Sequence, residues 1–292
     1  MAVNGPFYQA ISGAEEGLLK RTADKISPLI FMELMLAYRK NQTKLLVYFF
    51  LIAGVMILIF FSLIDTEIQK LELICNVIIM ISGACSTLAG GAYASSSLSG
   101  EKEKKTLTLL RVSGLSSFKI ISGKIITVFA FMAAPFAPFA LLMLLLPLFG
   151  DIGYAKIFGG IYIWTAMTLF FLSLAAFISL LFQKNSVSNS VYYVFLFLLH
   201  FMIAIPDSLF FSRTNDYYFN VKFFASFSPF EIWSSYARHS AIASSYSYRY
   251  EINVVENFPD YIFTGAIFLL LALLICMCAS NMFESYLRWK GE

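Results

Sequence analysis

The chain has 292 residues, of which 59% are hydrophobic and only 13% are charged. About a quarter of the residues in a soluble domain are charged, so this composition excludes a soluble globular protein and indicates an integral membrane protein. The net charge is only +3, and the basic residues stand in short segments beside apolar runs, so nothing indicates nucleic acid as a partner.

Residues 1–44 form a polar N-terminal arm without the apolar core of a signal peptide. An apolar stretch begins at Pro28 and ends before Arg39, which is too short for the roughly 20 residues that a transmembrane helix requires. Proline is favoured in the first turn of a helix. The stretch therefore predicts a short helix that lies in the membrane interface, with the arm in the cytoplasm.

Six apolar segments follow within residues 45–292, which we expect to form one transmembrane domain. None contains Asp, Glu, Lys or Arg, and each is close to the length of a membrane helix. They comprise residues 45–64, 73–94, 125–149, 157–182, 187–205 and 261–283. The sequence therefore predicts an all-α polytopic membrane protein with six transmembrane helices.

The second of these segments is rich in small residues. Small residues at intervals of about four positions let helix backbones approach closely in a membrane. We favour helix packing as their role over direct contact with a molecule that crosses the membrane. The residues concerned are Gly83, Ser86, Gly90 and Gly91.

Residues 100–124 form a short charged segment between the second and third apolar runs. Basic residues outnumber Glu101 and Glu103 here by the largest margin of any connection in the chain. Basic connections stay on the cytoplasmic side, so the segment predicts an orientation in which both termini are cytoplasmic. The basic residues are Lys102, Lys104, Lys105, Arg111, Lys119 and Lys124.

The same segment carries a helical pattern. Leu107 and Leu110 share one flank, and Gly114 provides a stop. Ser116 is placed to cap a second helix that continues into the third apolar run. An amphipathic helix between two membrane spans requires a cytoplasmic surface to dock against. The alternative is a solvated basic loop, but such a loop would not need the leucines.

Several residues of this segment follow one another in a characteristic order: Gly100, Glu101, Glu103, Thr106, Leu107, Leu110, Gly123 and Lys124. This order resembles the coupling segment of ABC-2-type transporter permeases. The stretch at Pro28, with Glu33 and Arg39, is similar to the elbow helix that precedes the first span in that family. The resemblance implies contact with a separate ATPase subunit through Glu101, Glu103, Thr106, Leu107, Leu110, Arg111 and Leu115.

The fifth apolar segment contains the polar residues Asn189, Tyr193 and His200. An ionisable residue inside a membrane is a functional candidate by default, although a neutral histidine bonded to a neighbouring helix is the commoner case. These three residues are candidates for either the translocation pathway or helix packing. Residues 206–260 follow as an outward segment whose centre is too apolar for a free loop, and it predicts re-entrant or interfacial helices before the last span. The alternative is a small folded lid that receives or releases the transported molecule.

The motifs of intrinsic catalysis are absent from the sequence. It has no nucleotide-binding glycine loop and no metal-binding histidine motif. All four cysteines stand inside apolar runs, where they behave as small hydrophobic residues. We therefore expect that this chain is not an enzyme and that it holds no catalytic residue, metal or cofactor.

The family resemblance implies a permease subunit of an ATP-driven exporter in the cell membrane. Such a subunit pairs with a second copy or a related permease, and with ATPase subunits that bind ATP and Mg. The alternative is a non-transporting, ABC-like scaffold or sensor that binds an extracellular partner through residues 206–260.

Overall fold

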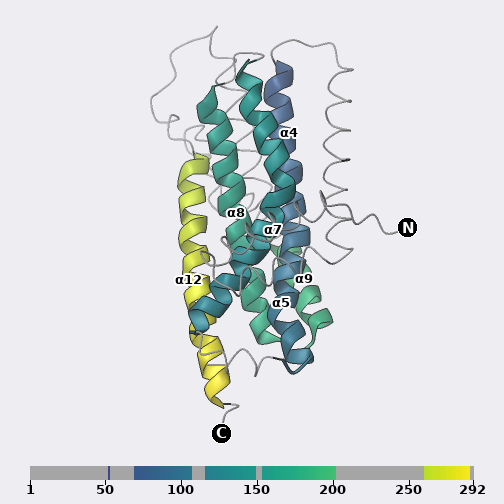
Figure 1. Ribbon diagram of the computed structural model, residues 1–292, viewed down its shortest axis with the longest axis vertical. Helices are drawn as coiled ribbons and strands as arrows, with labels where there is room; N and C mark the ends of the chain where they lie inside the picture. Colours follow the sequence, from purple (N-terminus) through teal and green to yellow (C-terminus); the bar gives the residue numbers. More distant parts are fainter. Residues whose placement is uncertain (1–51, 53–68, 107–115, 149–152, 202–259, 290–292) are drawn as a thin grey trace, which may run out of the picture.

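The computed structural model describes residues 52, 69–106, 116–148, 153–201 and 260–289. Every element in these ranges is helical, with no strand among them (Figure 1). The elements are α4 (Gln69–Cys85), the π-helix η1 (Ser86–Gly90), α5 (Gly91–Glu103), α7 (Ser117–Leu145), the 3₁₀-helix η2 (Leu146–Leu148), α8 (Tyr154–Leu181), α9 (Asn185–Phe201) and α12 (Asp260–Trp289). The N-terminal arm, nearly all of the first predicted span and residues 206–259 lie outside the described residues.

Four helices are long and apolar enough to cross a bilayer. They run over Ile74–Glu103, Ser117–Leu148, Tyr154–Leu181 and Ile262–Tyr286. The first of them has 30 residues and the shortest has 25, against the roughly 20 that the hydrocarbon core requires. The prediction of an all-helical membrane protein is therefore confirmed at this level.

The second predicted span is longer than expected, because α4, η1 and α5 form one continuous helix that ends at Glu103. The helix therefore continues nine residues beyond residue 94, the approximate end of the predicted span. Within these polar turns the Ser99 hydroxyl is satisfied inside the helix, since its Oγ donates to Ser95 O at 2.9 Å. Leu98 is fully buried, so packing keeps the polar turns after residue 94 helical, although their composition is not that of a membrane span.

Helix α7 begins at Ser117, directly after Ser116, and continues into the third apolar run, as predicted. The backbone of Ser116 is extended, and its carbonyl oxygen accepts a hydrogen bond from Ile120 N at 3.1 Å. The Ser116 side chain makes no capping bond, so the predicted cap is present in position only. Pro135 and Pro138 both lie within the helix.

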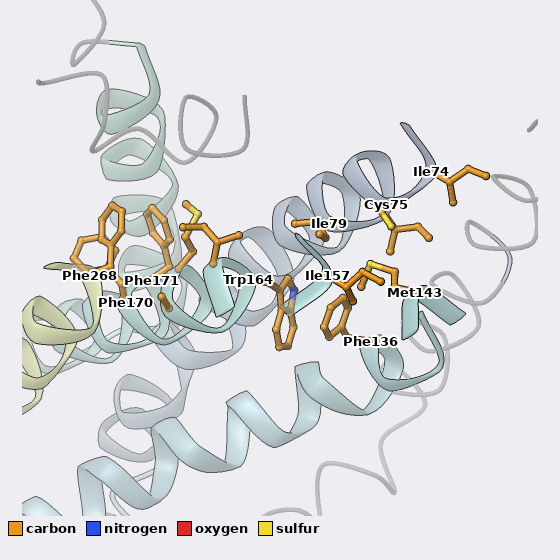
Figure 2. Close-up of a cluster of buried hydrophobic side chains, with 14 of the residues drawn as sticks. Ile74, Cys75, Ile79, Phe136, Met143, Ile157, Trp164, Phe170, Phe171 and Phe268 are labelled. Atoms are coloured by element: carbon orange, nitrogen blue, oxygen red, sulfur yellow. The ribbon is translucent and has the colours of Figure 1, made fainter. Parts of the chain in front are cut away.

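Helix α8 is the centre of the bundle, and it packs most extensively against α12 and α5. Apolar side chains fill the part of the core that Figure 2 shows. There the Trp164 indole stacks on the Phe136 ring, with centroids 4.0 Å apart. Phe170 of α8 lies 4.7 Å from the Phe268 ring of α12, so aromatic contacts join three helices.

Hydrogen bonds join α5 to α8 and α9 in the other part of the core. Ser179 Oγ of α8 accepts bonds from the backbone N–H groups of Leu98 at 3.0 Å and Ser99 at 2.8 Å. Ser188 Oγ of α9 donates to Ser95 O at 2.7 Å, and all these serines are buried. The polar face of α5 is thus satisfied inside the protein, as backbone groups in a membrane must be.

Candidate functional site

The site forms where α5 ends and α7 begins, and its members are Glu101, Lys102, Glu103 and Lys124, here called the charged cluster. Lys124 Nζ lies 2.6 Å from Glu101 Oε1. The Lys124 side chain is only 5% exposed, whereas that of Glu101 is 24% exposed. An ammonium group this deeply buried requires a carboxylate partner, so the ion pair fixes α5 against α7.

Lys102 connects α5 to two further helices. Its ammonium group donates a hydrogen bond to the carbonyl oxygen of Leu180, in the last turn of α8. It also lies 4.6 Å from the centroid of the Tyr286 ring on α12. The first contact satisfies a carbonyl that the end of a helix leaves without an intrahelical partner, and the second is a cation–π interaction.

Glu103 reaches the beginning of α9. Its Oε2 accepts a hydrogen bond from the Asn185 backbone N–H at 3.2 Å. The first N–H groups of a helix have no intrahelical partner, and a carboxylate there also interacts favourably with the helix dipole. Helix α5 is therefore tied to α9 as well, through a contact on the exposed side of the cluster.

The backbone at the end of α5 closes in a Schellman turn. Thr106 N donates to Glu101 O at 3.0 Å, and Lys105 N donates to Lys102 O at 3.2 Å. This turn places Lys105 in the left-handed conformation with a φ of 58°, where glycine is usual. The turn directs the chain away from the helix axis just before residue 107.

The charged cluster can transmit a displacement between helices. Three consecutive residues of α5 contact α7, α8, α9 and α12, so α5 cannot shift at this end without changing contacts to all four. Figure 1 shows α5 and α9 side by side in the same half of the bundle, with the C-terminal part of α12 at the same end.

Metal binding finds no support among the residues that the structure describes. No three His, Cys, Asp or Glu side chains gather there in a way that would hold an ion. The four cysteines are all described and all free thiols.

The predicted coupling residues are described only in part. Glu101 and Glu103 belong to the charged cluster, and the Thr106 hydroxyl contacts Glu101 O at 3.4 Å. Leu107, Leu110, Arg111 and Leu115 lie outside the described residues, as do Pro28, Glu33 and Arg39 of the predicted elbow helix.

The small residues of the second span lie in and beside η1. A Cβ added at Gly90 would lie 3.0 Å from Met132 Cγ, and one added at Gly91 only 2.0 Å from the Tyr192 hydroxyl oxygen. Gly83 and Ser86 are buried on the same helix. These positions therefore stand at helix contacts in this structure.

The polar residues of the fifth span occupy different surroundings. Asn189 Oδ1 accepts a hydrogen bond from Ser95 Oγ of α5. Tyr193 is exposed, and its hydroxyl oxygen lies 3.4 Å from Leu88 O. His200 belongs to α9 by its backbone, but its side chain lies outside what the structure describes.

The sequence shows Lys102, Lys124 and Tyr192 but does not mark them as residues that join one helix to another. Lys124 was noted as part of a motif and as a loop charge, but not as a buried partner of Glu101. One signal in the sequence could have indicated the ion pair. Lys124 stands directly before an apolar run, and Glu101 follows the preceding one. Nothing in the sequence marked Tyr192 above the neighbouring Tyr193.

A comparison with known protein families gives no match, and no curated protein matches the chain. The membrane assignment therefore depends on composition and on the four long apolar helices.

Proposed function

We propose that the chain is the membrane subunit of an ATP-driven ABC exporter of the ABC-2 type. Two copies, or one copy and a related permease, would form the pathway and would pair with separate ATPase subunits that bind ATP and Mg. The support is the order of residues in 100–124 together with the arrangement of the charged cluster.

The observation that carries the proposal is the ion pair between Glu101 and Lys124. These residues stand before and after residues 107–115, in the helices that precede and follow that segment. A force applied to the segment would therefore act on α5 and α7 as a unit. Lys102 and Glu103 would pass the displacement to α8, α9 and α12, as rigid-body transitions of packed helices require.

The proposal includes an orientation. The charged cluster would face the cytoplasm, with both termini on the same side of the cell membrane. The excess of lysine and arginine in residues 100–124 supports this, because positively charged connections are retained on the cytoplasmic side.

The test places a charge on the leucines that would dock on the ATPase. We expect Leu107→Asp and Leu110→Asp to abolish co-purification of the ATPase and cargo-stimulated ATP hydrolysis, because burying an unpaired carboxylate costs a few kcal/mol. Ser116→Asp is the matched control, since Ser116 is exposed and aspartate is favoured before a helix. Wild-type coupling in both leucine variants, or a wild-type protein that captures no ATPase, would contradict the proposal.

A further inference from the structure

We infer that α5 has two registers, one residue apart, and that the π-helix η1 takes up the difference. A π-helix fits an extra residue into a turn, and such segments are rare in helices and frequent at functional sites. If η1 relaxes to an α-helix, every residue of α5 advances by about 1.5 Å and turns by about 100°. The place of each residue is then taken by the residue before it.

The contact with Tyr192 tolerates this shift. The Tyr192 side chain is fully buried against Gly91, where any Cβ would overlap the phenol ring. After a shift of one residue Gly90 would occupy that place. Because residue 90 is also a glycine, the Tyr192 ring packs against a residue without a Cβ in both registers.

The hydrogen bonds from α8 and α9 that reach backbone atoms of the long helix tolerate it as well. The Tyr192 hydroxyl donates to Thr87 O at 2.7 Å, and Ser188 Oγ donates to Ser95 O. Ser179 Oγ accepts from two consecutive backbone N–H groups. Backbone groups recur at every residue, so a shift replaces each partner by an equivalent one.

Outside the charged cluster, one side-chain hydrogen bond between α5 and α9 distinguishes the two registers. Ser95 Oγ donates to Asn189 Oδ1, and after the shift Ala94 would face Asn189 instead. The charged cluster distinguishes them more strongly. Gly100 would take the place of Glu101 beside Lys124, so the ion pair holds α5 in the described register. Events that loosen the cluster would release the helix, whether or not an ATPase is the partner.

The test uses cysteine pairs in the full-length protein in membranes, after the four native cysteines are replaced by alanine. Oxidation should cross-link Ser95→Cys with Asn189→Cys, which reports the described register. Oxidation should also cross-link Ala94→Cys with Asn189→Cys in a smaller fraction of the protein, and this cross-link reports the shifted register. Ser96→Cys with Asn189→Cys is the matched control, because that pair meets in neither register.

Two substitutions then act on the shift in opposite directions. Gly90→Ala should abolish the 94–189 cross-link and keep the 95–189 cross-link, since in the described register the new methyl group meets only the flexible side chains of Met132 and Leu172. Lys124→Met should raise the 94–189 fraction at the expense of 95–189, because it removes the ion pair.

Three results would overturn the inference. The first is a 95–189 pair that does not cross-link, or a 94–189 pair that stays at background. The second is equal cross-linking of the 94–189 and 96–189 pairs, which would indicate general mobility of α5. The third is a 94–189 cross-link that persists in Gly90→Ala. If Gly90→Ala does not fold, the response of both pairs to Lys124→Met decides the question.

Discussion

A methyl group at Gly91 would place its carbon 2.0 Å from the hydroxyl oxygen of Tyr192, a side chain that is completely buried. The ring cannot move away without giving up its bond to Thr87 O. We therefore expect Gly91→Ala to lower the thermal stability of the purified protein strongly, by about 1–3 kcal/mol or more from overpacking. Differential scanning fluorimetry in detergent would measure the effect.

Two other glycines provide graded controls for this substitution. Gly90→Ala should cost less, because its methyl group meets side-chain atoms at 3.0 Å or more. Gly100→Ala should be neutral or stabilising by up to about 1 kcal/mol, since no atom lies within 4 Å of the added carbon and alanine favours a helix. Equal losses at all three positions would contradict the packing that the structure shows.

Tyr192→Phe should destabilise the protein by about 1 kcal/mol, the usual contribution of one buried hydrogen bond. The ring and its packing remain, so assembly should persist. Tyr193→Phe is the matched control, because the neighbouring hydroxyl belongs to an exposed side chain and makes a longer contact of 3.4 Å. A larger loss for Tyr193→Phe than for Tyr192→Phe would be inconsistent with these surroundings.

The two partners of the ion pair should respond unequally to substitution. Glu101→Ala leaves the buried Lys124 without its carboxylate and should cost about 3 kcal/mol, the scale for breaking a buried pair. Lys124→Met should cost less, because methionine suits a buried position and Glu101 is the more exposed member of the pair. Unfolding midpoints of both variants and of the double variant would measure the coupling.

Lys105→Gly should stabilise the end of α5, by up to about 1 kcal/mol, because a left-handed conformation strains any residue with a Cβ. Lys104→Gly should have the opposite sign, since Lys104 has a φ of −81° and gains nothing from glycine. Both residues are exposed lysines, so the pair also controls for the lost charge. Amide hydrogen exchange of residues 100–106 would report both effects.

Cysteine labelling in intact cells tests the proposed orientation. A cysteine at the exposed Ser116 should be protected from a membrane-impermeant reagent, whereas one at Ser235 or Ser245 should react. Labelling at Ser116 from outside would reverse the orientation and remove the support for cytoplasmic coupling.

The sequence predicts the helical membrane architecture well, because hydropathy is a property of each segment by itself. The predicted fourth span, 157–182, differs little from α8, and a helix begins directly after Ser116 as expected. The sequence does not reveal where α5 ends, because Ser95, Leu98 and Ser99 stay helical through contacts with α8 and α9. Such contacts depend on which helices are neighbours.

In the site, too, the sequence shows the charged residues but not how the helices bury them. Glu101 and Lys124 are both visible in the sequence as charges in a short segment, but nothing there pairs them. The structure instead buries Lys124 and leaves Glu101 only 24% exposed. Hydropathy could not show this, because the burial arises from the way α5 and α7 close on each other.

The buried pair also constrains how the chain enters the membrane. Lys124 stands near the start of α7, where an unpaired charge opposes insertion of the helix, although by less than the cost of about 2.5–3.5 kcal/mol for a charge at the helix centre. Glu101 lies 23 residues earlier and has therefore left the ribosome before Lys124 does. The neutralising partner is already in place when α7 arrives, which favours insertion of α5 and α7 together as a helical hairpin.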